Sequence, residues 1–235
     1  MLFNSEPVGW RSHQPDPEAR GRRSRQDVWR LGLQRHGGAG FAQSVPARAP
    51  PYVMALHFGV QILQRRDEVT LLYLLYNTVR HVRLNASHPE NLTPNWQGHS
   101  VGWYEGDALV IDTVGIKVVP ISTVDAFGTP HSEALHVVER YRLIDGEAAA
   151  AAQKKHGAIY RPAPPYGRGT IDPDTAKKGL QVEFTVEDEG VFTTPWSGRV
   201  TYRRLIGDWP EAVCAENPSF FGIDAAIPTA HTPDF

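Results

Sequence analysis

After residue 50, the dominant pattern along the chain is a period-two alternation of apolar and polar residues, which predicts β-strands. The clearest run lies at 180–187, where Leu180, Val182, Phe184 and Val186 alternate with polar side chains. Further strands are expected at residues 58–62, 79–84, 97–104, 108–114, 134–143 and 196–205. Residues 69–76 are apolar on both faces, which predicts a strand covered on both sides. The pattern therefore predicts about eight strands, most of them joined by short turns.

One stretch, PNWQGHSVGWYEGDALVIDTVG at residues 94–115, combines two of these runs with a turn signal. Glu105, Gly106 and Asp107 separate the two runs, and a Gly-Asp pair between β-rich segments is typical of a hairpin. We expect Gly106 to adopt the positive φ that such a turn needs.

A long sheet with local connections tends to close, because closure removes exposed edges. We therefore expect a mainly β protein: an antiparallel meander of about eight strands closing as a lipocalin-like barrel. An open or sandwiched sheet is the alternative. One short helix is expected in a long loop, from Glu147 to His156, because its alanines have high helix propensity and Gly157 can end it.

The first fifty residues differ from the rest, with eight Arg, no Lys and four acids. We expect residues 1–48 to form a poorly ordered Arg-rich extension and residues 49–235 a single β-barrel-like domain. A helix at 25–34 is possible within the extension. A basic arm for nucleic acid is the alternative function of this segment.

Charge and composition limit the classes of partner that the chain is expected to bind. The net charge of −2 indicates neither nucleic acid nor membrane as a partner. No apolar run approaches the ~20 residues of a transmembrane helix, and the first residues lack the apolar core of a signal peptide. Cys214 is the one cysteine, so no internal disulfide can form. Compartment and oligomeric state are left open.

Four blocks resemble a family of uncharacterised bacterial proteins: residues 94–115, PHSEALHVVERYR at 130–142, VEDEGVFTTPW at 186–196 and VCAEN at 213–217. With the strands between them, they cover roughly residues 52–235. The resemblance implies no reaction and no catalytic residues. Many members of the family look exported, whereas this chain shows no signal sequence.

Candidate chemistry begins with Glu139. Alternation places Glu139 and Tyr141 on the apolar face of their strand, and a core-facing carboxylate needs a partner or a raised pKa. Glu139 is then either a general acid or base, or the partner of an arginine such as Arg83 or Arg203.

The other candidates lie in the quoted blocks. His99 shares a strand face with Trp103 and could act as a general base beside an aromatic wall, or be a hydrogen-bonded structural histidine. His131 and Ser132 lie in a loop that enters a strand, where a barrel rim is expected. No metal site is predicted, since neither HExxH nor CxxC occurs; the P-loop and the GxGxxG fingerprint are also missing, and no cofactor is expected.

Two functions of different classes follow. The first is a binding module whose lumen holds a small apolar or aromatic molecule, with Trp103, Tyr141 and Ser132 as contacts. The second is a cofactor-independent lyase, isomerase or hydrolase that uses His99, Glu139 and Tyr141, with His131 as a further candidate, for acid–base chemistry. A barrel filled by side chains would instead indicate a structural or interaction role.

Overall fold

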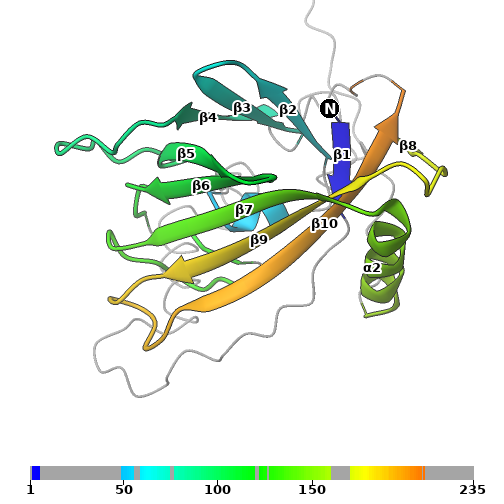
Figure 1. Cartoon of the computed structure of the whole chain (residues 1–235). Coiled ribbons are helices and arrows are strands. Elements are labelled where there is room, and N and C mark those ends of the chain that lie inside the picture. Colours follow the sequence, from blue (N-terminus) through cyan, green and yellow to red (C-terminus); the bar gives the residue numbers. More distant parts are fainter. Residues whose placement is uncertain are drawn as a thin grey trace, which may run out of the picture.

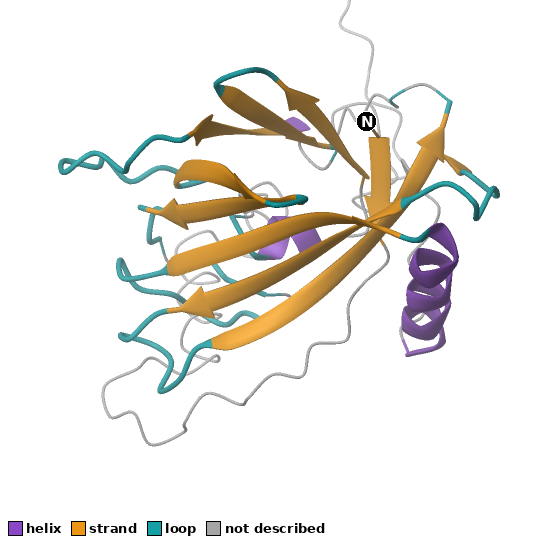
Figure 2. Cartoon of the chain, viewed as in Figure 1, coloured by secondary structure: helices purple, strands orange, loops and turns teal. Residues whose placement is uncertain are grey.

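The protein is mainly β, with one long helix, in a computed structural model that describes residues 2–5, 49–55, 59–74, 77–119, 122–125, 127–159, 170–207 and 209 (Figures 1 and 2). The strands are β1 (Leu2–Ser5), β2 (Gly59–Gln64), β3 (Glu68–Tyr73), β4 (Thr78–Leu84), β5 (His99–Glu105), β6 (Ala108–Val114), β7 (His136–Ile144), β8 (Thr170–Ile171), β9 (Gly179–Glu187) and β10 (Trp196–Ile206). The helical elements are the 3-10 turn η1 (Tyr52–Ala55) and the α-helix α2 (Gly146–Ile159).

The described strands form one ten-stranded sheet in the order β1-β2-β3-β4-β5-β6-β7-β9-β10-β8, and β1 also pairs with β10. Strand β1 lies within the segment expected to be an extension, and its backbone pairs with β2 through Leu2–Asn4 and with β10 through Phe3–Ser5. Sequence neighbours are sheet neighbours from β1 to β7, so the mainly β, largely antiparallel prediction is confirmed.

The predicted hairpin forms β5 and β6. Their register runs from His99 opposite Val114 to Glu105 opposite Ala108, which leaves Gly106 and Asp107 as the turn. Gly106 has φ +62°, a left-handed conformation that an L side chain disfavours. The Gly-Asp signal therefore located the turn correctly.

The prediction of an antiparallel meander is wrong at one pair, because β4 and β5 are parallel. Only Val82, Arg83 and Leu84 pair, opposite residues 100–102. A parallel pair needs a crossover of about a dozen residues or more, and the connection at 85–98 is long enough to return the chain to the same end of the sheet. The end of this connection is held by Asn95, whose amide donates to Gly115 O at 3.1 Å.

One face of the sheet forms the core. The buried positions alternate along β7 and β9, as the period-two pattern predicts. They also alternate along β3, so the expectation that this strand is covered on both faces is wrong: one of its faces is buried and the other is half-buried. Element η1 packs on this face: Met54 is fully buried and its carbonyl accepts a hydrogen bond from Tyr202 Oη at 2.8 Å. The interior is therefore occupied by side chains from the strands and from η1.

Helix α2 lies in the connection between β7 and β9, as predicted, and packs against β9 and β10. Asp145 caps it, with Oδ1 accepting hydrogen bonds from the amides of Glu147 and Ala148. The predicted end at Gly157 is wrong, since the helix continues to Ile159. The expected helix at 25–34 and Cys214 lie outside the described residues.

Candidate functional site

A cleft of about 380 Å³ separates the first half of β4 from the segment that leads into β5. Its walls are Val79, Arg80, His81 and Arg83 on one side and residues 95–100 on the other. The cleft lies where the pairing of β4 with β5 is missing, because the register begins only at Val82 and Ser100. The short parallel pair is therefore the feature that creates this site.

The lining of the cleft contains two arginines and no carboxylate, and because the charge of Arg80 is paired with Glu139, Arg83 supplies the positive charge of the cleft. Arg83 makes no ion pair with any residue in the described ranges. Glu68 lies opposite Arg83 in the register of β3 and β4, but it bonds to Thr70 and His81. Trp96 adds an aromatic wall and is 37% exposed.

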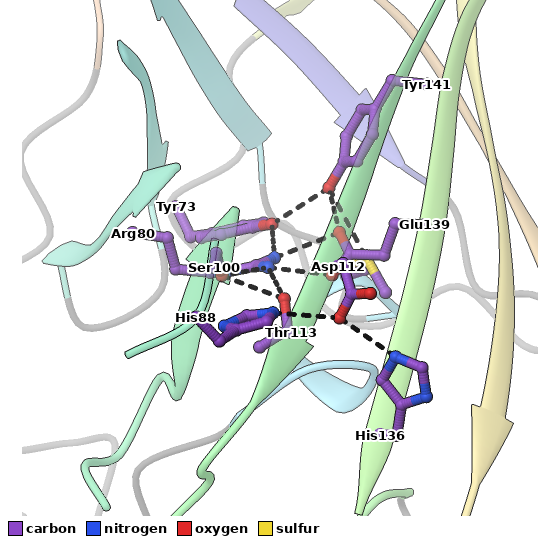
Figure 3. Close-up of polar contacts among 10 residues, drawn as sticks. Tyr73, Arg80, His88, Ser100, Asp112, Thr113, His136, Glu139 and Tyr141 are labelled. Atoms are coloured by element: carbon purple, nitrogen blue, oxygen red, sulfur yellow. Dashed lines mark hydrogen bonds and ion pairs between the residues drawn. The ribbon is translucent and has the colours of Figure 1, made fainter. Parts of the chain in front are cut away.

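Arg80 forms the inner part of the cleft and makes a bidentate ion pair with Glu139 (Figure 3). Arg80 Nη2 lies 2.8 Å from Glu139 Oε1, and Arg80 Nη1 lies 3.1 Å from Oε2. Arg80 is 1% exposed and Glu139 0%. Burial alone would lower the pKa of Arg80, but the charge and hydrogen bond of Glu139, together with Tyr73 and Tyr141, raise this pKa well above its ordinary value.

Hydroxyl groups complete the network around this ion pair. Arg80 donates to Tyr73 Oη, Ser100 Oγ and Thr113 Oγ1, at 3.2, 3.1 and 3.0 Å. Tyr141 Oη donates to Glu139 Oε2 at 2.7 Å. Burial, and then the charge of Glu139, raise the pKa of Tyr141 well above its ordinary value, so its hydroxyl stays protonated.

One buried donor of this network is unsatisfied. Arg80 Nε has no hydrogen-bond partner among the described residues, although the other two guanidinium nitrogens are fully engaged. An unpaired buried N–H costs about 1–3 kcal/mol. Arg80 therefore carries a donor that a bound molecule or water could satisfy at the inner end of the cleft.

On the opposite face of the sheet, two histidines converge on Asp112 (Figure 3). His88 Nε2 lies 3.2 Å and His136 Nε2 3.0 Å from the same oxygen, Asp112 Oδ1. His88 Nδ1 lies 2.8 Å from Nδ1 of His99, which itself lines the cleft. We call His88, His99, Asp112 and His136 the Asp112 cluster.

The strand register separates His99 from Glu139. Ser100 pairs with Thr113 and Thr113 with Val137, so Ser100 and Glu139 share a face and His99 lies on the other. His99 therefore does not share a pocket with Glu139 and Tyr141, because side chains alternate along each strand. His99 and Arg80 instead meet at the cleft, where the sheet is interrupted.

The remaining candidates have structural partners. Trp103 lies on the same face as His99 and donates to Glu105 Oε1 at 2.8 Å, so it does not wall the interior. Ser132 donates through its amide and its hydroxyl to Asp188, each at 2.6 Å. His131 is buried in the 130–135 loop, and Nδ1 donates to Ser132 O at 3.1 Å.

Two residues of the site, Arg80 and His88, were not predicted from the sequence. Arg80 has a usable signal, because it shares the alternation of Val82 and therefore the buried face of β4. The sequence instead suggests Arg83 or Arg203 as the partner of Glu139, and both are wrong. Arg83 is exposed, and Arg203 donates to Asp172 O. His88 lies in an irregular connection, where no period indicates its direction.

No family model, curated protein or solved structure matches this chain. Within the described residues, no helix is both long and apolar enough to cross a membrane. In the same ranges, no three His, Cys, Asp or Glu side chains are arranged to hold a metal ion.

Proposed function

We propose that this chain is a binding protein for a small organic anion with an aromatic or apolar body, held in the cleft between β4 and β5. The observation that carries the proposal is the lining: two arginines and two histidines line the cleft with no carboxylate. Such a surface attracts negative charge, and the volume is within the range of small-molecule sites.

The same proposal includes closure of the sheet as a barrel. The pairing of β1 with β2 on one side and with β10 on the other supports closure, because each of these strands then has two neighbours. Closure through β1 would leave the cleft as an interruption in an otherwise continuous wall.

The ligand is proposed for the cleft rather than for the barrel interior. Tyr141 is engaged with Glu139 and Met54, and Trp103 lies on the opposite face. The cleft keeps an aromatic wall in Trp96 and offers the charge of Arg83, which no carboxylate of the described ranges pairs. Guanidinium groups bind carboxylates by paired hydrogen bonds, so a carboxylate is the favoured anionic group.

Titration calorimetry with two matched aromatic probes tests this function. Naphthalene-2-carboxylate carries the charge and naphthalene-2-methanol does not. We expect the carboxylate to bind about tenfold more tightly, a difference of about 1.4 kcal/mol. Arg83→Gln should remove most of this preference, whereas Arg66→Gln, an exposed arginine in the turn between β2 and β3, should leave it unchanged. Equal affinities for the two probes in the unmodified protein would contradict the proposal.

A further inference from the structure

Asp112, His88 and His99 form a line of hydrogen-bonding groups that ends at the cleft. His99 contacts His88 through Nδ1, and its other ring nitrogen, Nε2, has no hydrogen-bond partner among the described residues. We propose that His99 Nε2 is the base of an acid–base reaction in the cleft, and that His88 and Asp112 take up the charge of the proton. The inference rests on the proposed binding function, since the substrate is the molecule held there.

The contacts fix where the protons lie. A carboxylate only accepts hydrogen bonds, so His88 Nε2 carries a proton and donates it to Asp112 Oδ1. Two imidazole nitrogens 2.8 Å apart must share one proton, because two lone pairs or two N–H groups would repel. With His88 neutral, its Nδ1 is bare and accepts from His99 Nδ1–H. His99 Nε2 is then also bare, which is the form that a base requires.

This arrangement gives a balanced proton transfer. His99 Nε2 removes a proton from the substrate, and the electron pair of the broken bond stays on the substrate. The proton on His99 Nδ1 moves to His88 Nδ1 along the 2.8 Å contact. His99 ends neutral with its proton on Nε2, and His88 ends as an imidazolium whose Nε2–H faces the Asp112 carboxylate.

The surrounding charges favour this direction. Burial lowers the pKa of His99, and the charges of His88 and of Arg83 on β4 lower it further. A cation is therefore disfavoured on His99 and favoured on His88, beside Asp112. His136 on β7 also contacts Asp112 Oδ1, at 3.0 Å, and its Nδ1 lies 3.4 Å from Glu187. His136 orients the carboxylate without entering the cleft lining.

The geometry also indicates a substrate class. A carboxylate bound by Arg83 places the neighbouring atoms of the same molecule near His99, since both residues line the cleft. The substrate would be a small organic acid with a second ionisable position, a hydroxyl or an activated C–H. The reaction class is proton abstraction, as in a lyase or isomerase that needs no cofactor.

The probe for the basic nitrogen is 4-nitrophenyl acetate. A bare imidazole nitrogen attacks its acetyl carbon, the ester C–O bond breaks, and 4-nitrophenolate leaves; water then hydrolyses the acetyl-imidazole to acetate. His99→Asn keeps a donor at the Nδ1 position and removes Nε2. We expect it to lower the release of nitrophenolate at least tenfold relative to His156→Gln, a matched histidine loss in helix α2. Equal rates in these two variants would overturn the proposal.

Asp112 is a positioning residue, so its test is the pH profile. In the unmodified protein the rate should reach half its maximum below pH 6.5, the ordinary histidine value. Asp112→Asn should shift this half-point to lower pH, because the carboxylate no longer stabilises a cation on the two histidines. A merely structural role would leave the half-point in place, and that result would contradict the relay.

Two further measurements keep the inference separate from the binding function. Side-chain ¹⁵N NMR of the unmodified protein should show the proton of neutral His99 on Nδ1; a proton on Nε2 would overturn the proposal even if the variants fail to fold. If Arg83→Gln leaves the carboxylate preference intact while His99→Asn loses activity, the binding function fails and the base stands.

Discussion

At the scale of single residues, Arg80 and Glu139 form the most deeply buried ion pair in the described part of the chain. Both side chains are essentially inaccessible to water; both terminal nitrogens of Arg80 also donate to hydroxyl groups, and Glu139 Oε2 accepts a hydrogen bond from Tyr141 Oη. Removing two charges from water is expensive, and these hydrogen bonds offset that cost, although Arg80 Nε has no partner among the described residues. The ion pair and its partners come from β3, β4, β5, β6 and β7, and the pair therefore links five strands.

Glu139→Gln should destabilise the protein by about 3 kcal/mol or more, because it leaves the Arg80 cation buried without its carboxylate. The urea midpoint measures the change. Glu105→Gln is the matched control: Glu105 pairs with Arg140 at the surface, where an ion pair contributes at most about 1 kcal/mol. Similar losses in the two variants would show that burial of the first pair has no special cost.

His131 gives the protein a pH dependence of stability. Burial lowers the pKa of His131, and its buried Nε2 has no hydrogen-bond partner in the part of the chain that the structure describes, so the folded state resists protonation. The unfolded chain then binds more protons near pH 6, and the free energy of unfolding should fall as the pH drops below the ordinary histidine value of about 6.5.

Urea titrations at about pH 7.5 and pH 5.5 measure this fall, which spans the ordinary histidine range. His131→Asn keeps a donor for Ser132 O but cannot titrate, so the loss of stability between the two pH values should be smaller in this variant. An identical loss in both proteins would assign the effect to other groups, among which His99 also has a lowered pKa.

At the scale of elements, two glycines frame the hairpin of β5 and β6 and differ in their surroundings. Both have positive φ, +69° at Gly98 and +62° at Gly106. A Cβ on Gly98 would lie 2.7 Å from the carbonyl oxygen of Val114, whereas a Cβ on Gly106 would meet nothing within 4 Å. Gly106 is thus constrained by conformation alone, and Gly98 by conformation and space.

Gly98→Ala should therefore cost more stability than Gly106→Ala. The left-handed conformation costs an alanine about 1–2 kcal/mol at either position, and the backbone clash at Gly98 should add about 1–3 kcal/mol. Chemical denaturation of the two variants under the same conditions gives the comparison. Equal losses would mean that the β5 entry can move away from Val114.

Elements whose signals are local could be predicted from the sequence. The turn at Gly106, the alternation of Leu180, Val182 and Phe184, and the alanine-rich helix each depend on neighbouring residues only. The parallel pairing of β4 with β5 could not be predicted, because it depends on the path of a connection of irregular sequence. The same connection carries His88, which joins Asp112 to His99 at the cleft. This contact could therefore not be predicted from the sequence either.

The candidate site was accessible from the sequence only in part. Glu139 could be recognised as a buried carboxylate needing a partner, since it lies between Val137 and Tyr141 on an apolar face. Its partner, and the separation of His99 from it, depend on register between strands that are far apart in the sequence. A single-residue shift of register would exchange the two faces.

At the scale of the whole molecule, the four residues of β1 should matter beyond their number. They pair with both β2 and β10, so removing residues 1–5 exposes two strand edges at once. We expect the melting temperature to fall by more than ~5 °C, which is roughly 2 kcal/mol for a domain of this size. Replacement of residues 6–10 by a Gly-Ser segment, which spares these pairings, is the control. An unchanged melting temperature after deletion would show that the pairings of β1 do not contribute measurably to stability.

The short pairing of β4 with β5 also affects how readily the sheet opens locally. Three register pairs join these strands, against seven between β5 and β6, so the β4–β5 ladder opens locally at a lower free-energy cost than the β5–β6 ladder, while the Arg80–Glu139 pair still joins β4 to β7. Amide hydrogens along this boundary should exchange with solvent sooner than those of β7 and β9. A bound molecule that contacts Arg83 on one wall and His99 on the other would join the two strands. Binding should therefore slow amide hydrogen exchange in both β4 and β5.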